Sequence, residues 1–401
     1  MAQMWVLVGA VSLAIWVVLL VARGGFWRFR DVIERDPVPD DTDGGAAPAI
    51  AAIIPARDEA AAIGRAVHSL LASRYAGPLH VFVVDDHSSD GTAELARNAA
   101  GKAEAGHRLT VLPARPLPPG WTGKLWAVAQ GVEAATATAP DFLLLTDADV
   151  VHAPGNVARL VARAQRGRLD IASVMVRLRC RTLAERLAVP AFVFFFFKLY
   201  PPAWIANPRS RVAGAAGGCI LIRPEALARI GGIAAIRSEL IDDCALAERV
   251  KSSGGRIWLG LSRDTESVRP YAGFAAVREM IARTAFTQLR HSAPLLLGTL
   301  AGMALIYLAP PLLLLAPDNA ARALGLAAWL SMSAAYAPAL RFYRQSVLLA
   351  PLLPLTAAFY TFATVESAVR YWRGAGGLWK GRMQDVRPPR RESETPRRPR
   401  A

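Results

Sequence analysis

The chain has 401 residues, 53% of them hydrophobic, and a formal net charge of +15 at pH 7. Its mean hydropathy of +0.27 is high for a purely soluble protein, so we expect part of the chain to lie in lipid. The excess of arginine suits nucleic acid or anionic lipid headgroups, or reflects a genome rich in arginine codons. No basic and aromatic platform accompanies the basic C-terminal tail, so we expect the membrane bilayer as a partner and no nucleic acid.

The first apolar segment, residues 4–22, carries no charge and is long enough to cross a bilayer as one helix. A cleaved signal peptide is the alternative, but no basic residue precedes the run and no small-x-small cleavage site follows it. Arginines follow instead, and the positive-inside rule then places the N-terminus outside and the next region in the cytosol. We predict a transmembrane anchor at 1–24 and a linker at 25–48.

From residue 49 onward, buried-strand patterns alternate with helical patterns. Strands are predicted at 49–56, 79–86, 108–114 and 142–149, and helices at 59–73, 90–100 and 124–136. This alternation is typical of βαβ units and predicts an α/β domain whose mostly parallel sheet is covered by helices on both faces. We assign this cytosolic catalytic domain to residues 49–290.

Three more apolar stretches follow the domain, and a basic tail closes the chain; the stretches are 293–316, 322–340 and 346–366. Four spans that start outside would put the basic tail outside as well, against the positive-inside rule. We therefore expect three true spans, one re-entrant stretch within 291–370, and a cytosolic tail at 371–401.

A further aromatic and apolar segment lies inside the catalytic domain, at 189–206. It is interrupted by Lys198 and by prolines, so we predict an interfacial or re-entrant element, although its crossing the membrane would resolve the same conflict of topology. Together the apolar segments predict a multi-pass protein of the cell inner membrane.

Acidic residues follow two of the predicted strands. One strand ends in Asp86 in VFVVDDHSSDGT, and another is followed by Asp147 and Asp149 in FLLLTDADV. Ligands of open parallel sheets bind at the carboxyl ends of the strands, where Asp86 could accept hydrogen bonds from a base or ribose. Asp147 and Asp149 cannot both ionise cheaply in a closed pocket, which predicts a divalent ion, Mg²⁺ or Mn²⁺, between them and a diphosphate. For Asp86, helix capping and turn formation are the alternative roles, and for Asp147 and Asp149 the alternative is a chance D-x-D pattern.

Three other segments suit contacts with a nucleotide. Arg57 and Glu59 follow the first strand in IIPARDEA, although a helix-starting acidic residue is an equally good interpretation. Lys124 opens a helix in GWTGKLWA, where a lysine and free N–H groups attract phosphate, with a solvated lysine as the alternative. The glycine-rich GAAGGCILIR, which includes Gly218, indicates close approach to a substrate or to another backbone.

The segment SELIDDCALAERV offers a general base. Sugar transfer to a hydroxyl needs a group that accepts the hydroxyl proton, and the carboxylates of Asp242 and Asp243 can do so. N-capping of the following helix is the alternative for Asp242.

In this order and spacing, IIPARDE, VVDDHSSDGT, GKLWA, TDAD and IDD resemble the family 2 glycosyltransferases, which have an A-type nucleotide-sugar fold. The resemblance covers about 49–290. RTAFTQLR and WKGR at 379–382, with the anchor and the C-terminal spans, look like the hopene-associated glycosyltransferases of hopanoid gene clusters, and ceramide glucosyltransferases are more distantly similar. The resemblance implies a metal-dependent, inverting transferase that passes a sugar from a nucleotide-sugar donor, a UDP-sugar, to a lipid acceptor such as a hopanoid or a sphingolipid-like molecule.

The resemblance also implies residue roles. Asp243 is then the catalytic base with Asp242 beside it, Asp149 holds the metal with Asp147 beside it, and Asp86 contacts the nucleotide base. The residues placed in the nucleotide-sugar site are Pro55, Arg57, Glu59, Asp86, Lys124, Asp147, Gly218 and Arg283.

The chain departs from the family pattern at two points. Asp242 stands where many relatives carry Glu, and Arg283 is followed by Thr284, so that the motif Q-x-x-R-W is incomplete. The second departure puts a leaving-group role of Arg283 in doubt and speaks against processive synthesis. A non-catalytic, nucleotide-sugar-binding membrane scaffold of a lipid pathway is the alternative function.

Overall fold

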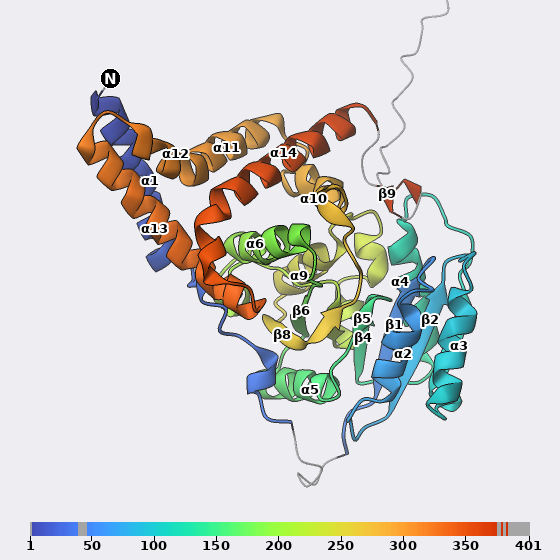
Figure 1. Ribbon diagram of the computed structural model, residues 1–401. Helices are drawn as coiled ribbons and strands as arrows, with labels where there is room; N and C mark the ends of the chain where they lie inside the picture. The colour runs from blue at the N-terminus through green and yellow to red at the C-terminus, as the bar shows by residue number, and fades with distance from the viewer. Residues whose placement is uncertain (1, 39–45, 375–377, 380–381, 384–401) are drawn as a thin grey trace, which may run out of the picture.

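The computed structural model describes residues 2–38, 46–374, 378–379 and 382–383. Part of the predicted linker and most of the predicted basic tail at 371–401 therefore lie outside the described residues. The described chain forms an α/β domain that carries apolar helices from both ends of the sequence (Figure 1).

Within the described residues, the domain is built on an eight-stranded sheet in the order β3-β2-β1-β4-β7-β6-β8-β5. The first four of these strands run parallel to one another and β6 is parallel to β8, whereas β7 and β5 are antiparallel to their neighbours. The predicted α/β class with a mostly parallel sheet is confirmed. The strands are β1 Ile50–Ala56, β2 Leu79–Asp85, β3 Leu109–Pro113, β4 Phe142–Thr146, β5 Val150–Val151, β6 Ile171–Arg177, β7 Cys219–Ile222 and β8 Ile257–Ser267.

Helices cover both faces of this sheet. All seven residues of β1 are buried, and they alternate: Ala51 and Ile53 pack on the side of α4, α6 and α9, whereas Ile50 and Ile54 pack on the side of α2, α3 and α5. Both faces of β1 are therefore covered by helices, which accounts for a strand that is apolar at every position. The helices of the domain are α2 Ile63–Leu71, α3 Thr92–Lys102, α4 Gly123–Thr136, α5 Asn156–Gly167, α6 Leu183–Leu199, α7 Pro202–Ala206, α8 Pro224–Arg229, α9 Asp242–Ser252 and α10 Gly273–Gln288.

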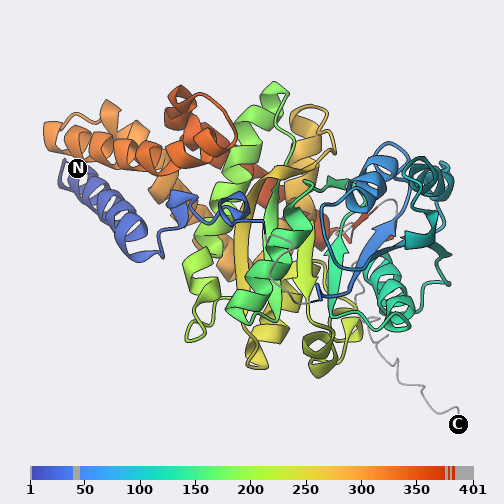
Figure 2. The same ribbon diagram turned by 90° about the horizontal axis from the view of Figure 1, so that it is seen from below.

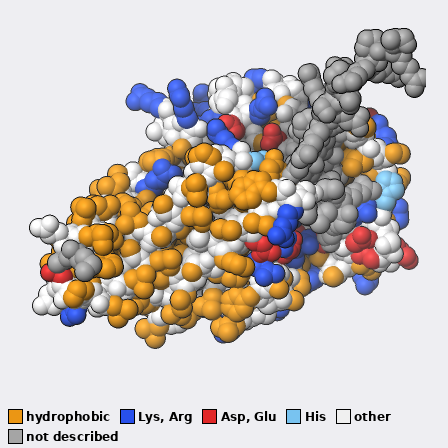
Figure 3. All heavy atoms as spheres, turned by 90° about the horizontal axis from the view of Figure 1, so that it is seen from above, with side chains coloured by type: hydrophobic (Ala, Val, Ile, Leu, Met, Phe, Trp, Pro, Cys, Tyr) orange, Lys and Arg blue, Asp and Glu red, His pale blue; other side chains and the backbone are white. Residues whose placement is uncertain are grey.

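The apolar helices form a layer beside the domain. α1 Ala2–Ala22 lies along α13 Asn319–Phe342, and both extend away from the sheet (Figures 1 and 2). α14 Leu353–Trp372 packs against α10 and thereby ties this layer to the domain. Figure 3 shows a broad face of hydrophobic side chains on this side of the molecule. Large exposed side chains on the helical segments of this layer include Leu297, Leu315, Leu348, Leu355 and Phe362.

Among the described residues, five helical segments are long and apolar enough to cross a membrane: Gln3–Ala22, Leu183–Ala206, Ala293–Leu315, Asn319–Phe342 and Val347–Trp372. Four of them match the segments predicted from the sequence. The fifth, Leu183–Ala206, contains the aromatic segment that was expected to be too broken to span.

The interruption expected within 189–206 lies at Tyr200 and Pro201, between the end of α6 at Leu199 and the start of α7 at Pro202, whereas the helix runs unbroken through Pro190. α6 is one continuous helix with Pro190 inside it, and it starts with a capping box between Thr182 and Glu185. The residues around Pro190 are buried, so packing outweighs the helix-breaking effect of a proline. Because 56% of the apolar window around α6 is buried, against 17% for α1, α6 packs mainly against protein.

The segment from 293 to 315 is irregular. α11 Ala293–Met303 passes through a π-helical turn at Ala304–Leu308 into α12 Ala309–Leu312 and a 3₁₀ turn at Leu313–Leu315. Pro310 and Pro311 lack the N–H that a regular helix needs, which accounts for the interruption. The indole N–H of Trp16 on α1 donates to the carbonyl of Ile306 at 2.9 Å, so a neighbouring helix binds a carbonyl of the irregular turn.

Candidate active site

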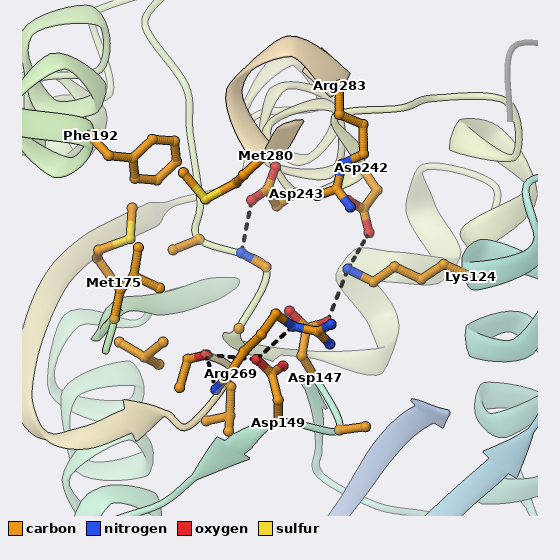
Figure 4. Close-up of a pocket in the computed structure, with 18 of the residues that line it drawn as sticks. Lys124, Asp147, Asp149, Met175, Phe192, Asp242, Asp243, Arg269, Met280 and Arg283 are labelled. Atoms are coloured by element: carbon orange, nitrogen blue, oxygen red, sulfur yellow. Dashed lines mark hydrogen bonds and ion pairs between the residues drawn. The ribbon is translucent and has the colours of Figure 1, made fainter. Parts of the chain in front are cut away.

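The candidate active site lies at the edge of the sheet where β1, β4 and β6 end and β7 begins. Thr146 at the end of β4 pairs with Cys219 at the start of the antiparallel β7, so residues that follow one strand meet residues that precede the other. A cavity of about 470 Å³ opens there (Figure 4). It is lined by all but two of the predicted site residues, namely Pro55, Glu59, Lys124, Asp147, Asp149, Gly218, Asp242, Asp243 and Arg283.

The two exceptions, Arg57 and Asp86, lie next to each other outside the cavity lining. The Arg57 guanidinium donates to the backbone carbonyl of Asp86 at 2.6 Å and lies 3.6 Å from its carboxylate. Asp86 is 2% exposed and also contacts the ring of His87 at 3.2 Å. The pair therefore lies at the carboxyl ends of the neighbouring strands β1 and β2, outside the residues that line the cavity.

Lys124 bridges two of the acidic motifs. Thr122 caps α4 by accepting from the N–H of Leu125, which fixes Lys124 in the first turn of the helix. Its ammonium lies 3.1 Å from Asp147 and 3.1 Å from Asp242 (Figure 4). Burial opposes the charge of Lys124, but the surrounding carboxylates outweigh it and hold the Lys124 pKa above its usual range. A freely solvated lysine, the alternative interpretation, is therefore wrong.

Asp243 lies in the first turn of α9 and faces the cavity. Its carboxylate accepts from the N–H of Gly217 at 2.8 Å and from the N–H of Cys244 at 2.7 Å. Burial and the neighbouring charge of Asp242 nevertheless raise the pKa of Asp243 to about 6. Asp242 makes no N-cap bond, because the cap position of α9 is Ile241, so the capping alternative for Asp242 is wrong.

Two residues at the end of β8, Arg269 and Ser267, complete the site and were missed in the sequence. The Ser267 hydroxyl donates to Asp149 at 2.6 Å, and the Arg269 guanidinium donates to Asp149 at 3.1 Å and to Glu59 at 2.6 Å. The two carboxylates outweigh the effect of burial and raise the Arg269 pKa above its usual range. The sequence around Arg269 gives no signal of this role, because the polar segment SRDTES separates it from the apolar run 257–261 and many solvated arginines stand in such surroundings.

The cavity carries more negative than positive side chains. Its lining includes six carboxylates, counting Glu279, against the three cations Lys124, Arg269 and Arg283. Burial and repulsion by Asp149 and Asp242 raise the pKa of Asp147 against the opposing effect of Lys124. A site of this charge cannot accept a diphosphate cheaply without an additional cation.

Asp147 and Asp149 are the residues that could hold that cation. Among the residues that the structure describes, no three His, Cys, Asp or Glu side chains form a group able to hold a metal ion by themselves. Two carboxylates with ligands completed by phosphate and water are a usual set for Mg²⁺, so the donor set fits a divalent ion.

The opposite wall of the cavity is apolar. Met175 at the end of β6, Phe192 and Phe196 on α6, and Met280 on α10 line it. In Figure 4, Met280 lies beside Asp243, and Phe192 and Met175 lie on the same side of the cavity, away from Lys124. The site therefore presents charge on one side and an apolar surface on the other.

Comparison with known proteins assigns this arrangement. A model of the family described as Glycosyltransferase like family 2 matches residues 47–287, well over half of the chain. The chain belongs to this family. As a family 2 glycosyltransferase it uses a nucleotide sugar as donor, and the family match spans every motif that lines the cavity.

The individual proteins that resemble this family 2 glycosyltransferase share at most 30% sequence identity with it in the three comparisons that follow. An N-acetylglucosaminyltransferase from Rhizobium leguminosarum bv. viciae is 30% identical over 136 residues, which cover 34% of this chain and 30% of the relative. A mannosyltransferase from Pyrobaculum calidifontis in complex with GDP-Man and Mn²⁺ is 20% identical, with a TM-score of 0.48 over 90% of this chain and 99% of that one. Mannosyl-3-phosphoglycerate synthase from Rubrobacter xylanophilus is 17% identical, with a TM-score of 0.38 over 67% and 85% of the two chains.

Proposed function

We propose that the chain is a membrane-bound, metal-dependent inverting glycosyltransferase that passes a sugar, from a UDP-sugar, to the hydroxyl of a lipid at the cytosolic face of the inner membrane. The observation that carries this proposal is the division of the cavity. Its charged wall comes from the sheet edge, α4 and α9, whereas its apolar wall includes residues of α6 and α10, which pack against the apolar helix layer.

The charged wall suits the donor and the displacement. Asp243 accepts the proton of the acceptor hydroxyl, the hydroxyl oxygen bonds to the anomeric carbon from the side opposite the diphosphate, and the nucleoside diphosphate leaves with the bonding electrons. Its carboxylate is held by two backbone N–H groups, which fix its orientation, and its raised pKa makes it a stronger base than an ordinary aspartate.

Asp149 and Asp147 would hold a divalent ion, Mg²⁺ or Mn²⁺, that neutralises charge on the departing diphosphate. Lys124 forms ion pairs with both Asp147 and Asp242. It therefore fixes the position of a metal-binding carboxylate relative to the turn of α9 that carries Asp243. Arg269 and Arg283 add positive charge to the lining, and their guanidinium groups suit contacts with phosphate oxygens.

The apolar wall suits an acceptor with a large apolar body next to its hydroxyl. Met280 lies beside Asp243, so such an acceptor can contact sulfur and aromatic side chains while its hydroxyl reaches the base. α6 and α10, which supply this wall, pack against α14 of the apolar helix layer. The described residues contain five helical segments able to cross a membrane, one of which includes α6. We infer a hopanoid, or another polycyclic or sphingolipid-like molecule, from the resemblance of the tail motifs and from this wall.

Lipid profiling of a deletion strain beside its parent tests the proposal. The expected result is the loss of one glycolipid and the accumulation of its aglycone, restored by the wild-type gene and not by Asp149→Ala or Asp243→Asn. Restoration by both variants would instead support a scaffold that binds a nucleotide sugar without turnover. An unaltered lipid profile would move the acceptor to a soluble or polymeric species.

A further inference from the structure

A second cavity, of about 360 Å³, lies where the N-terminal helix meets the catalytic domain. Its lining includes Val21 at the end of α1, Phe197 on α6, Pro202 on α7, and the two arginines Arg28 and Arg30. It shares no lining residue with the catalytic cavity. It is therefore a separate site, placed at the boundary between the apolar helices and the domain.

A strained turn forms the wall of this second cavity. Gly24 and Gly25 have φ values of 62° and 60°, and a Cβ added at Gly24 would lie 3.0 Å from Pro201 and Trp204. Phe29 also has a positive φ, of 50°, which is costly for a residue with a side chain. The Phe29 ring packs against the ring of Phe197, with 5.3 Å between the centroids, and this contact holds the backbone in place. The backbone positions of the flanking residues Arg28 and Arg30 are thereby fixed.

The charge of this cavity is largely uncompensated. Arg28 and Arg30 are both exposed, and in the part of the chain that the structure describes neither forms an ion pair with an acidic side chain. Asp31 is the acidic residue of the lining, and its carboxylate is within the field of Arg163 and Arg35. Arg23 lies nearby, stacked 4.6 Å over Trp204 and donating to the carbonyls that end α6.

We propose that this cavity binds the phosphate of an anionic phospholipid, paired by Arg28 and Arg30, with the start of an acyl chain against Val21 and Phe197. α1 is apolar through Val21, and the first arginine, Arg23, follows two residues later. The cavity at this end of α1 would therefore lie at the depth where the hydrocarbon core meets the headgroups. Guanidinium groups suit phosphate oxygens, and the cytosolic leaflet is rich in anionic lipid. The proposal depends on the membrane placement of α1 and is independent of sugar transfer.

The test is lipid binding by the full-length protein purified in detergent, read by native mass spectrometry. Palmitoyl-oleoyl phosphatidylglycerol is titrated in parallel with the zwitterionic phosphatidylcholine of the same chains. The double variant Arg28→Gln/Arg30→Gln is expected to bind phosphatidylglycerol about 30-fold more weakly, and each single variant about fivefold more weakly. The matched control Arg65→Gln/Arg97→Gln, on exposed positions of α2 and α3, removes the same charge and is expected to bind as wild type does.

Three results would overturn the proposal. Undiminished phosphatidylglycerol binding by the single variants would show that the arginines do not contact the lipid, whether or not the double variant folds. An equal loss in the control would show that net charge alone decides. Full competition by soluble glycerol 1-phosphate would assign the site to a free phosphate ester, because a lipid site gains affinity from the acyl contact. None of these results depends on catalytic activity, so they leave the proposed function to its own test.

Discussion

Arg269 donates to the Asp149 carboxylate at 3.1 Å, so the carboxylate assigned to the metal already has a cationic neighbour within the chain. The same guanidinium reaches Glu59 at 2.6 Å and thereby joins the end of β8 to the loop after β1. A divalent ion at Asp149 would then share that carboxylate with Arg269 or displace it. Arg269 thus joins Asp149 to Glu59, and it would compete with the ion proposed at Asp149.

Replacement of Arg269 by Gln is expected to separate these two effects. With less positive charge beside Asp149, the free protein should bind Mn²⁺ more tightly, by about tenfold, while kcat/KM for the donor falls because the diphosphate loses a cationic contact. Titration of Mn²⁺ by electron paramagnetic resonance gives the first quantity, and initial rates give the second. Arg97→Gln, an exposed arginine on α3, is the control. Weaker Mn²⁺ binding in Arg269→Gln would show that Arg269 supports the ion instead of competing with it.

The pair Asp149→Asn and Asp147→Asn tests which carboxylate holds the ion. Asp149 is 6% exposed and held by Ser267 and Arg269, whereas Asp147 is more exposed and bonded to Lys124. We expect Asp149→Asn to lower kcat by about 10²–10³-fold and to abolish the dependence of donor binding on Mn²⁺. Asp147→Asn should keep part of that dependence. Equal and small effects in both variants would place the ion elsewhere.

Much of the fold was predictable because the strands of the sheet are buried on both faces. The uninterrupted apolar run of β1, followed by polar residues, gives both the strand and the position of the sheet edge. The motifs around Asp149 and Asp243 were found for the same reason, since a carboxylate directly after a buried strand or at the start of a helix stands out from its surroundings. The structure brings both residues into one cavity.

The remaining features depend on tertiary contacts that leave no local pattern. Arg269 is distinguished from other arginines only by its distance to Glu59 and Asp149, which lie far from it in the sequence. The continuity of α6 through Pro190 depends on buried neighbours, and proline rules weigh only the local backbone. Asp86 was implied in base contact by resemblance, and its pairing with Arg57 outside the cavity lining could not be read from its motif.

Glu185 predicts a stability effect. Its side chain is fully buried and accepts from the N–H groups of Arg181 and Thr182 at the start of α6 and from that of Tyr271 in the loop before α10. Glu185→Ala leaves buried N–H groups without an acceptor and is expected to lower the free energy of unfolding by about 3 kcal/mol. Glu185→Gln, which keeps one acceptor, should lose less. Denaturation of the detergent-purified protein measures both, and equal stability of Glu185→Ala and wild type would contradict the role.

The raised pKa of Asp243 predicts opposite pH dependences for activity and stability. If Asp243 is the base, as proposed, it works only when ionised, so kcat/KM should fall about tenfold per pH unit below about 6. Asp243→Asn should lower kcat by about 10²–10⁴-fold at every pH. Burial favours the protonated form in the folded state, so the stabilisation from that proton is complete below the unfolded pKa and is lost as pH rises through about 6. Thermal unfolding of Asp243→Asn should therefore depend less on pH between about 4 and 6 than that of wild type. An acid limb of activity that survives unchanged in a variant with residual turnover would assign the limb to another group.

The last prediction concerns the apolar wall. If the charged wall binds the donor and the apolar wall binds the acceptor, Met280 and Phe192 contact the acceptor and not the donor. Phe192→Ala and Met280→Ala should each raise the KM for the lipid acceptor by about tenfold, since each removes apolar contact that the bound acceptor covers, while the KM for the donor stays within a factor of two or so. Phe362→Ala, which removes a ring that is 58% exposed on α14, controls for a general effect on membrane packing. A parallel rise of the donor KM would show that this wall shapes the whole cavity. An equal effect of Phe362→Ala would mean that the acceptor is held by the helix layer and not by the wall beside Asp243.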